Sequence, residues 1–330
     1  NKTMQGIKVI KSLDTLNFIA NSTQKIQIPK AYTIGFLVSA DFTTTVAGAP
    51  ATMTAQSLAR TVANTFRCIL SGSDVRYSCS GEFLNLQNIF LTGNPTTTTI
   101  NNAVAVGNVQ RIEFFIPTCT KGMTIDGGDT TLNASTADTA IAEFQTGGNA
   151  SIDPSSNTTI TAGSIRTSAI VLEGVSGAAA APAIAGMRTQ ELALTAGTES
   201  TLDLAVGGQV GDVPLNQYIG LYLTFRITAT NVLTPADTAL SAVNLNAIGD
   251  TFINSNPREL LVAQNIETSA ATADLSGALF LRTTALSKLS TRIIAKAPQI
   301  SQLQLQLTGA AGIAATTCTV TSHYANAPIA

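Results

Sequence analysis

The chain has 330 residues and a formal net charge of −2 at pH 7, with 12% charged and 45% hydrophobic residues. Its length fits two domains or one large β domain. The composition excludes intrinsic disorder, which needs low hydrophobicity and high net charge, and a nucleic-acid binder that relies on a basic surplus. Because a soluble monomer normally keeps a charged surface, this charge-poor chain predicts a surface that neighbouring proteins cover.

The amino-terminal segment carries lysines among aliphatic residues. Lys2, Lys8 and Lys11 alternate with residues such as Ile7 and Ile10. A basic and apolar arm of this kind can lie on an anionic membrane surface. The same pattern also fits a first β-strand with solvated lysines, and both interpretations stay open.

Most of the remaining chain alternates between apolar and other residues with a period of two. The clearest runs are 34–42, 221–227 and 303–307. Such alternation is typical of strands with one buried face, and turn-forming clusters at 93–96 and 126–129 separate the runs. Many short strands joined by turns predict an all-β fold, a sandwich or a barrel.

An internal repeat is the most informative feature of the sequence. Residues 28–35 resemble residues 213–220, at an offset of about 185 residues. The match continues without a gap to Pro50-Ala51 and Pro235-Ala236. Because this period is far longer than that of a solenoid, it indicates two duplicated domains.

A short helix is expected at the same place in both copies. Leu58, Val62 and Phe66 are four residues apart, and a similar spacing runs through 240–248. The segment 234–237 has the residues of a helix start, with Thr234 as the N-cap, Pro235 in the first turn and Asp237 as a capping carboxylate. Each half therefore predicts a strand followed by a short helix.

Strands are expected to resume after both helices, at 68–70 and at 260–262. The stretch 176–188 is rich in Ala and Gly and suits a linker. We therefore expect an amino-terminal domain over residues 1–188 and a carboxy-terminal domain over residues 189–330.

The first domain is longer, and its extra residues are expected to form a surface loop. The segment is about 121–164, rich in Thr, Asn, Gly and Asp. Ser135 and Asp138 suggest the cap of a short helix that contains Ile141 and Phe144. Surface loops tolerate insertions, which favours this interpretation.

Signatures of catalysis are scarce. His323 is the only histidine, so any Ser-His-Asp or Cys-His site must use it, and a surface or strand-end position is the simpler expectation. Three aspartates near residue 130 lack the spacing of a calcium loop and also suit turns: Asp126, Asp129 and Asp138. The sequence predicts no enzyme activity, no catalytic residue, no cofactor and no metal site.

The four cysteines have no metal-ligand spacing. Cys68 and Cys79 could pair, although free thiols in a reducing compartment are the simpler expectation. The four positions are Cys68, Cys79, Cys119 and Cys318.

Two strand-rich copies, each with a helix after an early strand, resemble the double jelly-roll major capsid proteins of the PRD1–adenovirus-like lineage. The chain looks most like coat proteins of lipid-containing icosahedral bacteriophages. The segments that carry the resemblance are 28–51, 213–236 and 71–84. The resemblance implies two tandem eight-stranded jelly rolls with short helices in loops.

The resemblance also implies a structural role in a virion that assembles in the host cytoplasm. Three chains would form a homotrimeric capsomer with a pseudo-hexagonal outline, because three chains supply six similar domains. The implied partners are further copies of the chain, other virion proteins such as pentons, and internal membrane lipid. Sequence-specific nucleic-acid binding is not implied.

Two other classes of protein compete with this interpretation. A secreted surface subunit, such as an adhesin, a pilus subunit or a surface-layer protein, is also Thr-rich and β-rich, and disulfides between the cysteines would favour it. A sugar-binding β-sandwich is a weaker alternative, because sugar platforms use aromatic faces and the chain has no Trp.

Overall fold

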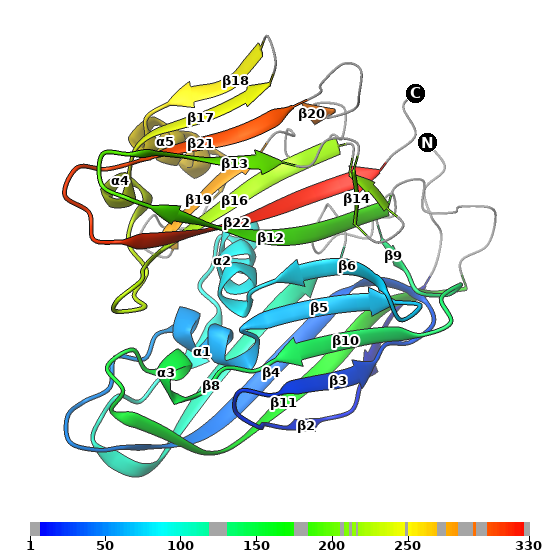
Figure 1. The fold of residues 1–330 in the computed structure, drawn as a ribbon. Helices are drawn as coiled ribbons and strands as arrows, with labels where there is room; N and C mark the ends of the chain where they lie inside the picture. The colour runs from blue at the N-terminus through cyan, green and yellow to red at the C-terminus, as the bar shows by residue number, and fades with distance from the viewer. Residues whose placement is uncertain are drawn as a thin grey trace. The chain divides into compact units, whose positions relative to one another are not determined.

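In the computed structural model the chain divides into two compact units, described here one at a time (Figure 1). The first unit comprises 1–91, 95–186 and 328–330, and the second comprises 92–94 and 187–327. The structure describes residues 7–118, 131–174, 184–204, 208–210, 213–215, 217–247, 250–268, 275–282, 293–294 and 302–326.

The first unit contains two sets of hydrogen-bonded strands. One has the order β1-β11-β4-β8-β7, with β2 paired to β11 and β9 paired to β4, and the other has the order β6-β5-β10-β3. The strands are β1 (Ile7–Ser12), β2 (Leu16–Asn17), β3 (Thr23–Gln27), β4 (Tyr32–Val46), β5 (Thr65–Leu70), β6 (Asp74–Cys79), β7 (Thr97–Thr99), β8 (Ala105–Pro117), β9 (Leu132–Asn133), β10 (Ala140–Gln145) and β11 (Thr158–Glu173). The helices are α1 (Ala55–Val62), α2 (Gly81–Thr92) and α3 (Asn149–Ile152).

The second unit has the same kind of organisation. Its strand orders are β19-β16-β22-β12, with β20 paired to β16, and β13-β21-β17-β18, and β14 pairs with β15 separately. The strands are β12 (Ile184–Leu194), β13 (Glu199–Leu204), β14 (Gly208–Val210), β15 (Val213–Leu215), β16 (Gln217–Ile227), β17 (Leu240–Ala247), β18 (Asp250–Ser255), β19 (Ala278–Arg282), β20 (Ile293–Ile294), β21 (Leu303–Gly309) and β22 (Thr316–Asn326). The helices are α4 (Ala236–Ala239) and α5 (Pro257–Glu267).

The two units have the same eight-strand topology. In chain order, the strands β1, β3, β4, β5, β6, β8, β10 and β11 of the first unit correspond to β12, β13, β16, β17, β18, β19, β21 and β22 of the second. Every pairing between neighbours within each set of four is matched, so β11-β4-β8 corresponds to β22-β16-β19. The helices α2 and α5 also occupy the same place in this order. Two antiparallel four-stranded sets per unit make a jelly roll, which confirms the predicted fold class.

The repeated Ile-Gly dipeptide marks the same backbone irregularity in both units. On β4, Thr33 and Gly35 pair with consecutive residues of β11, so Ile34 is an extra residue. On β16, Tyr218 and Gly220 pair with consecutive residues of β22, so the residue between them is likewise extra. Both are β-bulges, which place two residues of one strand opposite one of its partner. The predicted 185-residue offset therefore relates equivalent strands and equivalent bulges.

Aromatic side chains join the two strand sets of the first unit. Phe36 of β4 packs against Phe66 of β5, with ring centroids 6.1 Å apart. Phe66 in turn meets Phe144 of β10 edge to face at 5.2 Å. All three rings are fully buried. Such pairs add specific ring contacts to the burial of apolar surface that stabilises a sandwich.

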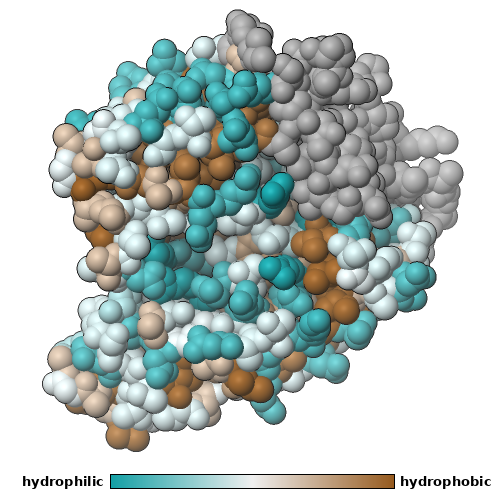
Figure 2. All heavy atoms as spheres, viewed as in Figure 1, coloured by the Kyte–Doolittle hydropathy of each residue, from teal (hydrophilic) through white to brown (hydrophobic). Residues whose placement is uncertain are grey.

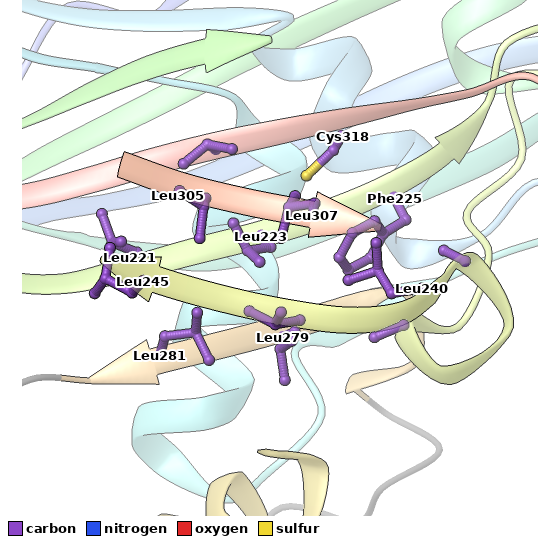
Figure 3. Close-up of a cluster of buried hydrophobic side chains, with 14 of the residues drawn as sticks. Leu221, Leu223, Phe225, Leu240, Leu245, Leu279, Leu281, Leu305, Leu307 and Cys318 are labelled. Atoms are coloured by element: carbon purple, nitrogen blue, oxygen red, sulfur yellow. The ribbon is translucent and has the colours of Figure 1, made fainter. Parts of the chain in front are cut away.

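Aliphatic side chains fill the core of the second unit. Figure 3 shows leucines of β16, β17, β19 and β21 in one buried cluster, to which Phe225 and Cys318 also belong. The alternation at 303–307 puts every second residue into this core, as the sequence predicted, and that at 221–227 does so for Leu221, Leu223 and Phe225, whereas Ile227 is only half-buried. Burying each leucine contributes about 1.5–3 kcal/mol relative to leaving it exposed.

Of the helices predicted by four-residue spacing, one is correct and one is wrong. Leu58 and Val62 lie in α1, although Phe66 already belongs to β5. The segment 240–247 is strand β17, because Val243 and Leu245 point inward with a period of two. The second helix is only the single turn α4, before that strand.

Four other expectations fail, wholly or in part, among the described residues. The segment 260–262 is part of helix α5 and not a strand. The expected surface loop 121–164 contains β9, β10, α3 and the start of β11 from residue 131 onward. Ile141 and Phe144 lie in β10, which pairs with both β3 and β5, so Ser135 and Asp138 cap no helix there. Part of the expected linker 176–188, from Ile184 onward, belongs to β12.

A buried aspartate fastens the loop between α3 and β11. Asp153 is fully buried, and its carboxylate accepts hydrogen bonds from the backbone of Thr52, Ser155 and Asn157. The hydroxyl of Thr158 also donates to it, at 2.9 Å. Burial alone would raise the pKa of this carboxyl group, but these hydrogen bonds outweigh burial and lower the pKa below its usual value.

Candidate interaction surfaces

The only histidine occupies an internal strand position. His323 lies in β22 opposite Gly220 of β16 and is 4% exposed, with its ring centroid 6.3 Å from that of Tyr222. The expected surface or strand-end position is therefore wrong. No cluster of three or more potential metal-ligating side chains occurs in the part of the chain that the structure describes. Asp126 and Asp129, considered for calcium, lie outside the described residues.

The described cysteines are buried free thiols. Cys68 on β5 and Cys79 on β6 are diagonal neighbours, since Phe66 pairs with Cys79 and Cys68 pairs with Tyr77. Burial raises the pKa of Cys68 to about 12, and burial, followed by the neighbouring Cys68, raises that of Cys79 further. Neither thiol has the low pKa and exposure of a reactive cysteine. Cys318 is also free and buried, and Cys119 lies outside the described residues.

Two of the three lysines of the predicted arm lie in a paired strand. Lys8 and Lys11 belong to β1, where they pair with Leu172 and Ala169 of β11. Lys11 also forms an ion pair with Glu173. Lys2 lies outside the described residues. Ile7 and Ile10 of the same strand are 73% and 59% exposed, so β1 presents both charge and apolar surface.

Charged side chains form two cross-strand groups on the outer faces of the first unit. Asp41 of β4 forms ion pairs with Arg111 of β8 and Arg166 of β11, the strands on either side. In the other strand set, Glu143 of β10 lies between Lys25 of β3 and Arg67 of β5, at 3.5 Å from each. In each group a central carboxylate links two flanking cations.

The corresponding outer face of the second unit is built mainly from amides. Asn246 of β17 donates to Gln306 of β21 at 2.7 Å, and Gln304 donates to Asp203 of β13 at 2.7 Å. Asn244 lies opposite Gln306 in the same ladder. Apart from Asp203, the side chains named here are uncharged, and uncharged polar groups can be covered by another protein without the high desolvation cost of unpaired charges.

Large apolar side chains are exposed at several further places, such as Ile19 and Phe252, and two groups of them are close together in the chain. One is the start of β8 and the turn before it, where Val104, Val106 and Val109 are between 52% and 84% exposed. The other is helix α5, where Val262 and Ile266 are 60% and 81% exposed. The face seen in Figure 2 is mostly pale or hydrophilic, with separate hydrophobic patches. Among the described residues, no helix has the length and apolar character needed to cross a membrane.

No protein-family model matches this sequence, and no curated protein is similar to it in sequence. Solved structures resemble the chain over nearly its whole length. The STIV major capsid protein (from Sulfolobus Turreted Icosahedral Virus) has a TM-score of 0.73 at 15% identity, covering 97% of both chains. The PBCV-1 virus capsid protein has a TM-score of 0.65 at 11% identity, covering 99% of this chain and 95% of the other.

The major capsid protein of bacteriophage PM2 gives a TM-score of 0.59 at 10% identity, covering 97% of both chains. At such low identity these likenesses establish the double jelly-roll fold. They extend over both units, so the whole chain, and not one half of it, is similar to these proteins.

Proposed function

We propose that the chain is the major capsid protein of an icosahedral virion. The observation that carries this proposal is the duplicated eight-strand topology, which resembles viral major capsid proteins over 97% of the chain. Within one chain, β11-β4-β8 and β22-β16-β19 repeat the same arrangement. A duplicated unit of this kind suits a shell, because similar units can make similar contacts around a ring.

The proposed assembly is a homotrimer. Three chains supply six jelly rolls, so a three-fold capsomer has a pseudo-hexagonal outline and can tile a lattice. The low charge content supports this proposal, because large obligate interfaces of roughly 2,000 Å² or more are depleted of charge in their centres. The amide ladder of Asn246, Gln304 and Gln306 gives such a surface in the second unit.

The proposed role is structural and involves no catalysis. The shell location follows from the proposal, with lateral contacts between capsomers and with other virion proteins such as pentons. The described thiols, Cys68, Cys79 and Cys318, are not joined in disulfides, so they give no support to the alternative of a disulfide-linked secreted subunit.

The solution mass tests the proposal. Light scattering coupled to size exclusion should give three times the chain mass of 34.0 kDa. A stable monomer under conditions that allow assembly would contradict it. Binding to sugars, with no trimer, would favour a glycan-binding role instead.

Contact of the amino-terminal strand with an internal membrane or the particle interior is a further part of the proposal. Lys8 is exposed on edge strand β1, beside Ile7 and Ile10. Deleting this segment would remove a strand that pairs with β11, so substitution is the better test. Lys2→Gln with Lys8→Gln should leave trimers intact and reduce assembly around lipid. If this variant formed normal lipid-containing particles, the proposed contact of the amino-terminal strand would be wrong.

A further inference from the structure

The sequence contains a single Asp-Pro peptide bond, between Asp153 and Pro154, in the loop from α3 to β11 (Figure 1). Asp-Pro bonds are hydrolysed in acid more readily than other peptide bonds, for two chemical reasons. The aspartate carboxyl group can reach the carbonyl carbon of its own backbone. The proline nitrogen belongs to a tertiary amide, so it is more basic than other amide nitrogens and leaves more easily once it is protonated.

The folded first unit holds both carboxylate oxygens of Asp153. Oδ1 accepts hydrogen bonds from the N–H and the hydroxyl of Thr52, at 3.0 and 3.2 Å. It also accepts from the N–H and the hydroxyl of Ser155, at 3.1 and 2.7 Å. Oδ2 accepts from the N–H of Asn157 and the hydroxyl of Thr158, both at 2.9 Å. Six donors therefore fix this one side chain.

The backbone of Asp153 is fixed as well. Its N–H donates to the carbonyl oxygen of Asn149 at 3.1 Å, and its own carbonyl oxygen accepts from the N–H of Ser156 at 3.0 Å. On the other side of the loop, Arg60 of α1 donates to two carbonyl oxygens of α3. The carbonyl group that an attack would reach is thus part of a bonded turn.

An attack on that carbonyl carbon requires a carboxylate oxygen to give up its donors. The movement would leave the buried hydroxyl of Thr158 or the N–H of Ser155 without an acceptor, which costs free energy. Asp153 is fully buried, whereas Ser155 and Ser156 are exposed. Water therefore reaches the turn, but the attacking group is withheld. The lowered pKa of the Asp153 carboxyl group agrees with this arrangement, because the donors favour the ionised, bonded form.

We propose that the bond between Asp153 and Pro154 is a self-cleavage site, which the folded loop keeps inactive and which acid activates when the loop opens. A side-chain oxygen of Asp153 bonds to the backbone carbonyl carbon of the same residue, and the carbon–nitrogen bond to Pro154 breaks. The proline nitrogen takes up a proton and becomes a new amino terminus. The cyclic anhydride left on Asp153 adds water and opens to a carboxy-terminal aspartate. The net reaction consumes one water molecule.

Cleavage at this bond would separate β11 from the strands that precede it in the chain. β11 pairs with β1, β2 and β4, all of which lie within residues 1–153. After cleavage these ladders would join two polypeptides instead of two parts of one. Refolding of an opened first unit would then depend on concentration, so acid opening would become hard to reverse on dilution.

The first test compares folded and unfolded full-length chain at the lowest pH at which circular dichroism still shows the native fold. Intact-mass spectrometry follows the fragments 1–153 and 154–330 in wild-type protein with and without guanidinium chloride. The unfolded chain should be cleaved at least about tenfold faster, which corresponds to an opening free energy of about 1.4 kcal/mol or more. Equal rates in the two samples, or no such fragments from the unfolded chain, would overturn the proposal.

A second test loosens the hydrogen bonds without changing the cleaved bond. Thr158→Val removes one donor to Asp153, and its matched control Thr161→Val removes a hydroxyl that donates to the carbonyl oxygen of Thr43. Folded Thr158→Val should be cleaved faster than wild type, and folded Thr161→Val at the wild-type rate. Equal cleavage of the two folded variants would show that the donors do not protect the bond. If Thr158→Val does not fold, the wild-type comparison decides alone.

The chemistry is tested in the unfolded chain, where folding of the variants does not matter. Pro154→Ala replaces the leaving nitrogen with that of a secondary amide, and Asp153→Asn removes the attacking carboxyl group. Both should strongly reduce the fragments 1–153 and 154–330. Cleavage at the wild-type rate in either variant would contradict attack by the Asp153 side chain.

Discussion

The first unit holds its outer faces together with charge, whereas the second unit uses amides. Asp41 and Glu143 each link two cations on neighbouring strands of the first unit. The matched ladder of the second unit pairs Asn246 with Gln306. Strand order, bulge and helix cap are nevertheless the same in both units. The two units therefore share the backbone features of the fold and differ in the chemistry of their outward-facing side chains.

Removing the buried aspartate of the first unit should have the largest effect. Asp153→Ala leaves the buried hydroxyl of Thr158 and the part-buried N–H groups of Ser155 and Asn157 without their acceptor, and an unsatisfied buried group costs about 1–3 kcal/mol. We expect the free energy of unfolding to fall by about 4 kcal/mol, measured by denaturant titration at fixed protein concentration. Asp203→Ala, on the exposed edge of the second unit, is the control and should cost far less. Equal losses of unfolding free energy in the two variants would contradict a larger stabilising contribution from buried Asp153.

The same residue gives a pH dependence with a defined sign. Because the folded-state pKa of Asp153 lies below its unfolded value of about 3.9, its stabilisation is complete above that value. The stabilisation is then lost as pH falls through the lower folded-state pKa. Wild type should therefore lose more stability than Asp153→Asn between about pH 4 and the acid unfolding transition. Parallel acid profiles for the two proteins would contradict the assignment.

The two bulge glycines should differ in their tolerance of a side chain. A Cβ atom on Gly35 would lie 2.4 Å from Cζ of Phe115 and 2.5 Å from the carbonyl oxygen of Ile116. On Gly220 the nearest atom, in the ring of Tyr222, would be 3.1 Å away. Gly35→Ala should cost about 2–3 kcal/mol and Gly220→Ala less than about 1 kcal/mol, by denaturant titration. A larger loss of unfolding free energy for Gly220→Ala than for Gly35→Ala would contradict this prediction.

The N-cap residues of helices α2 and α5 should contribute equally to stability, because each accepts a hydrogen bond from the third backbone N–H of its helix. Ser80→Ala and Asn256→Ala should each lower the free energy of unfolding by about 1 kcal/mol. Thr268→Ala, just beyond the end of α5, is a control that removes no N-cap. If one cap substitution left the melting temperature unchanged and the other lowered it, the two caps would not be equivalent.

The smallest effect should come from the exposed charges of the first unit. Asp41→Asn leaves Arg111 and Arg166 close together without their shared partner, at a cost of about 1 kcal/mol or less because all three side chains are partly exposed. The cost should shrink in 1 M NaCl, where the Debye length is about 3 Å. Asn246→Ala should show no such salt dependence. Salt-independent melting differences for Asp41→Asn would exclude an electrostatic role.

The sequence predicted the duplication because backbone constraints leave local traces. The Ile-Gly pair and the alternating runs appear twice at the 185-residue offset, and these segments became β4 and β16. Helix α5 was missed because a short apolar run such as 260–262 fits either a strand or a buried helix. The signal that could have identified it was the capping box, in which Asn256 and Glu259 bond reciprocally.

Other features depend on contacts between residues that are far apart in the chain. The four-residue spacing at 240–248 predicts a helix, but the same residues also alternate as in a strand, and only pairing with β21 selects the strand β17. The group of Asp41, Arg111 and Arg166 could not be found from sequence, since only strand register brings these residues together. The exposure of Val262 is likewise invisible without the packed side of α5. Pairing between strands that are distant in the chain therefore determined features that the local sequence pattern could not specify.

The central claim is that two related jelly rolls per chain build a six-unit ring from three chains. Electron microscopy of the purified, unlabelled protein tests it most directly. If three chains form this ring, the images should show particles with three-fold symmetry and a pseudo-hexagonal outline, in which six similar densities surround a centre. Images of single two-lobed particles, or of rings with another number of chains, would contradict it.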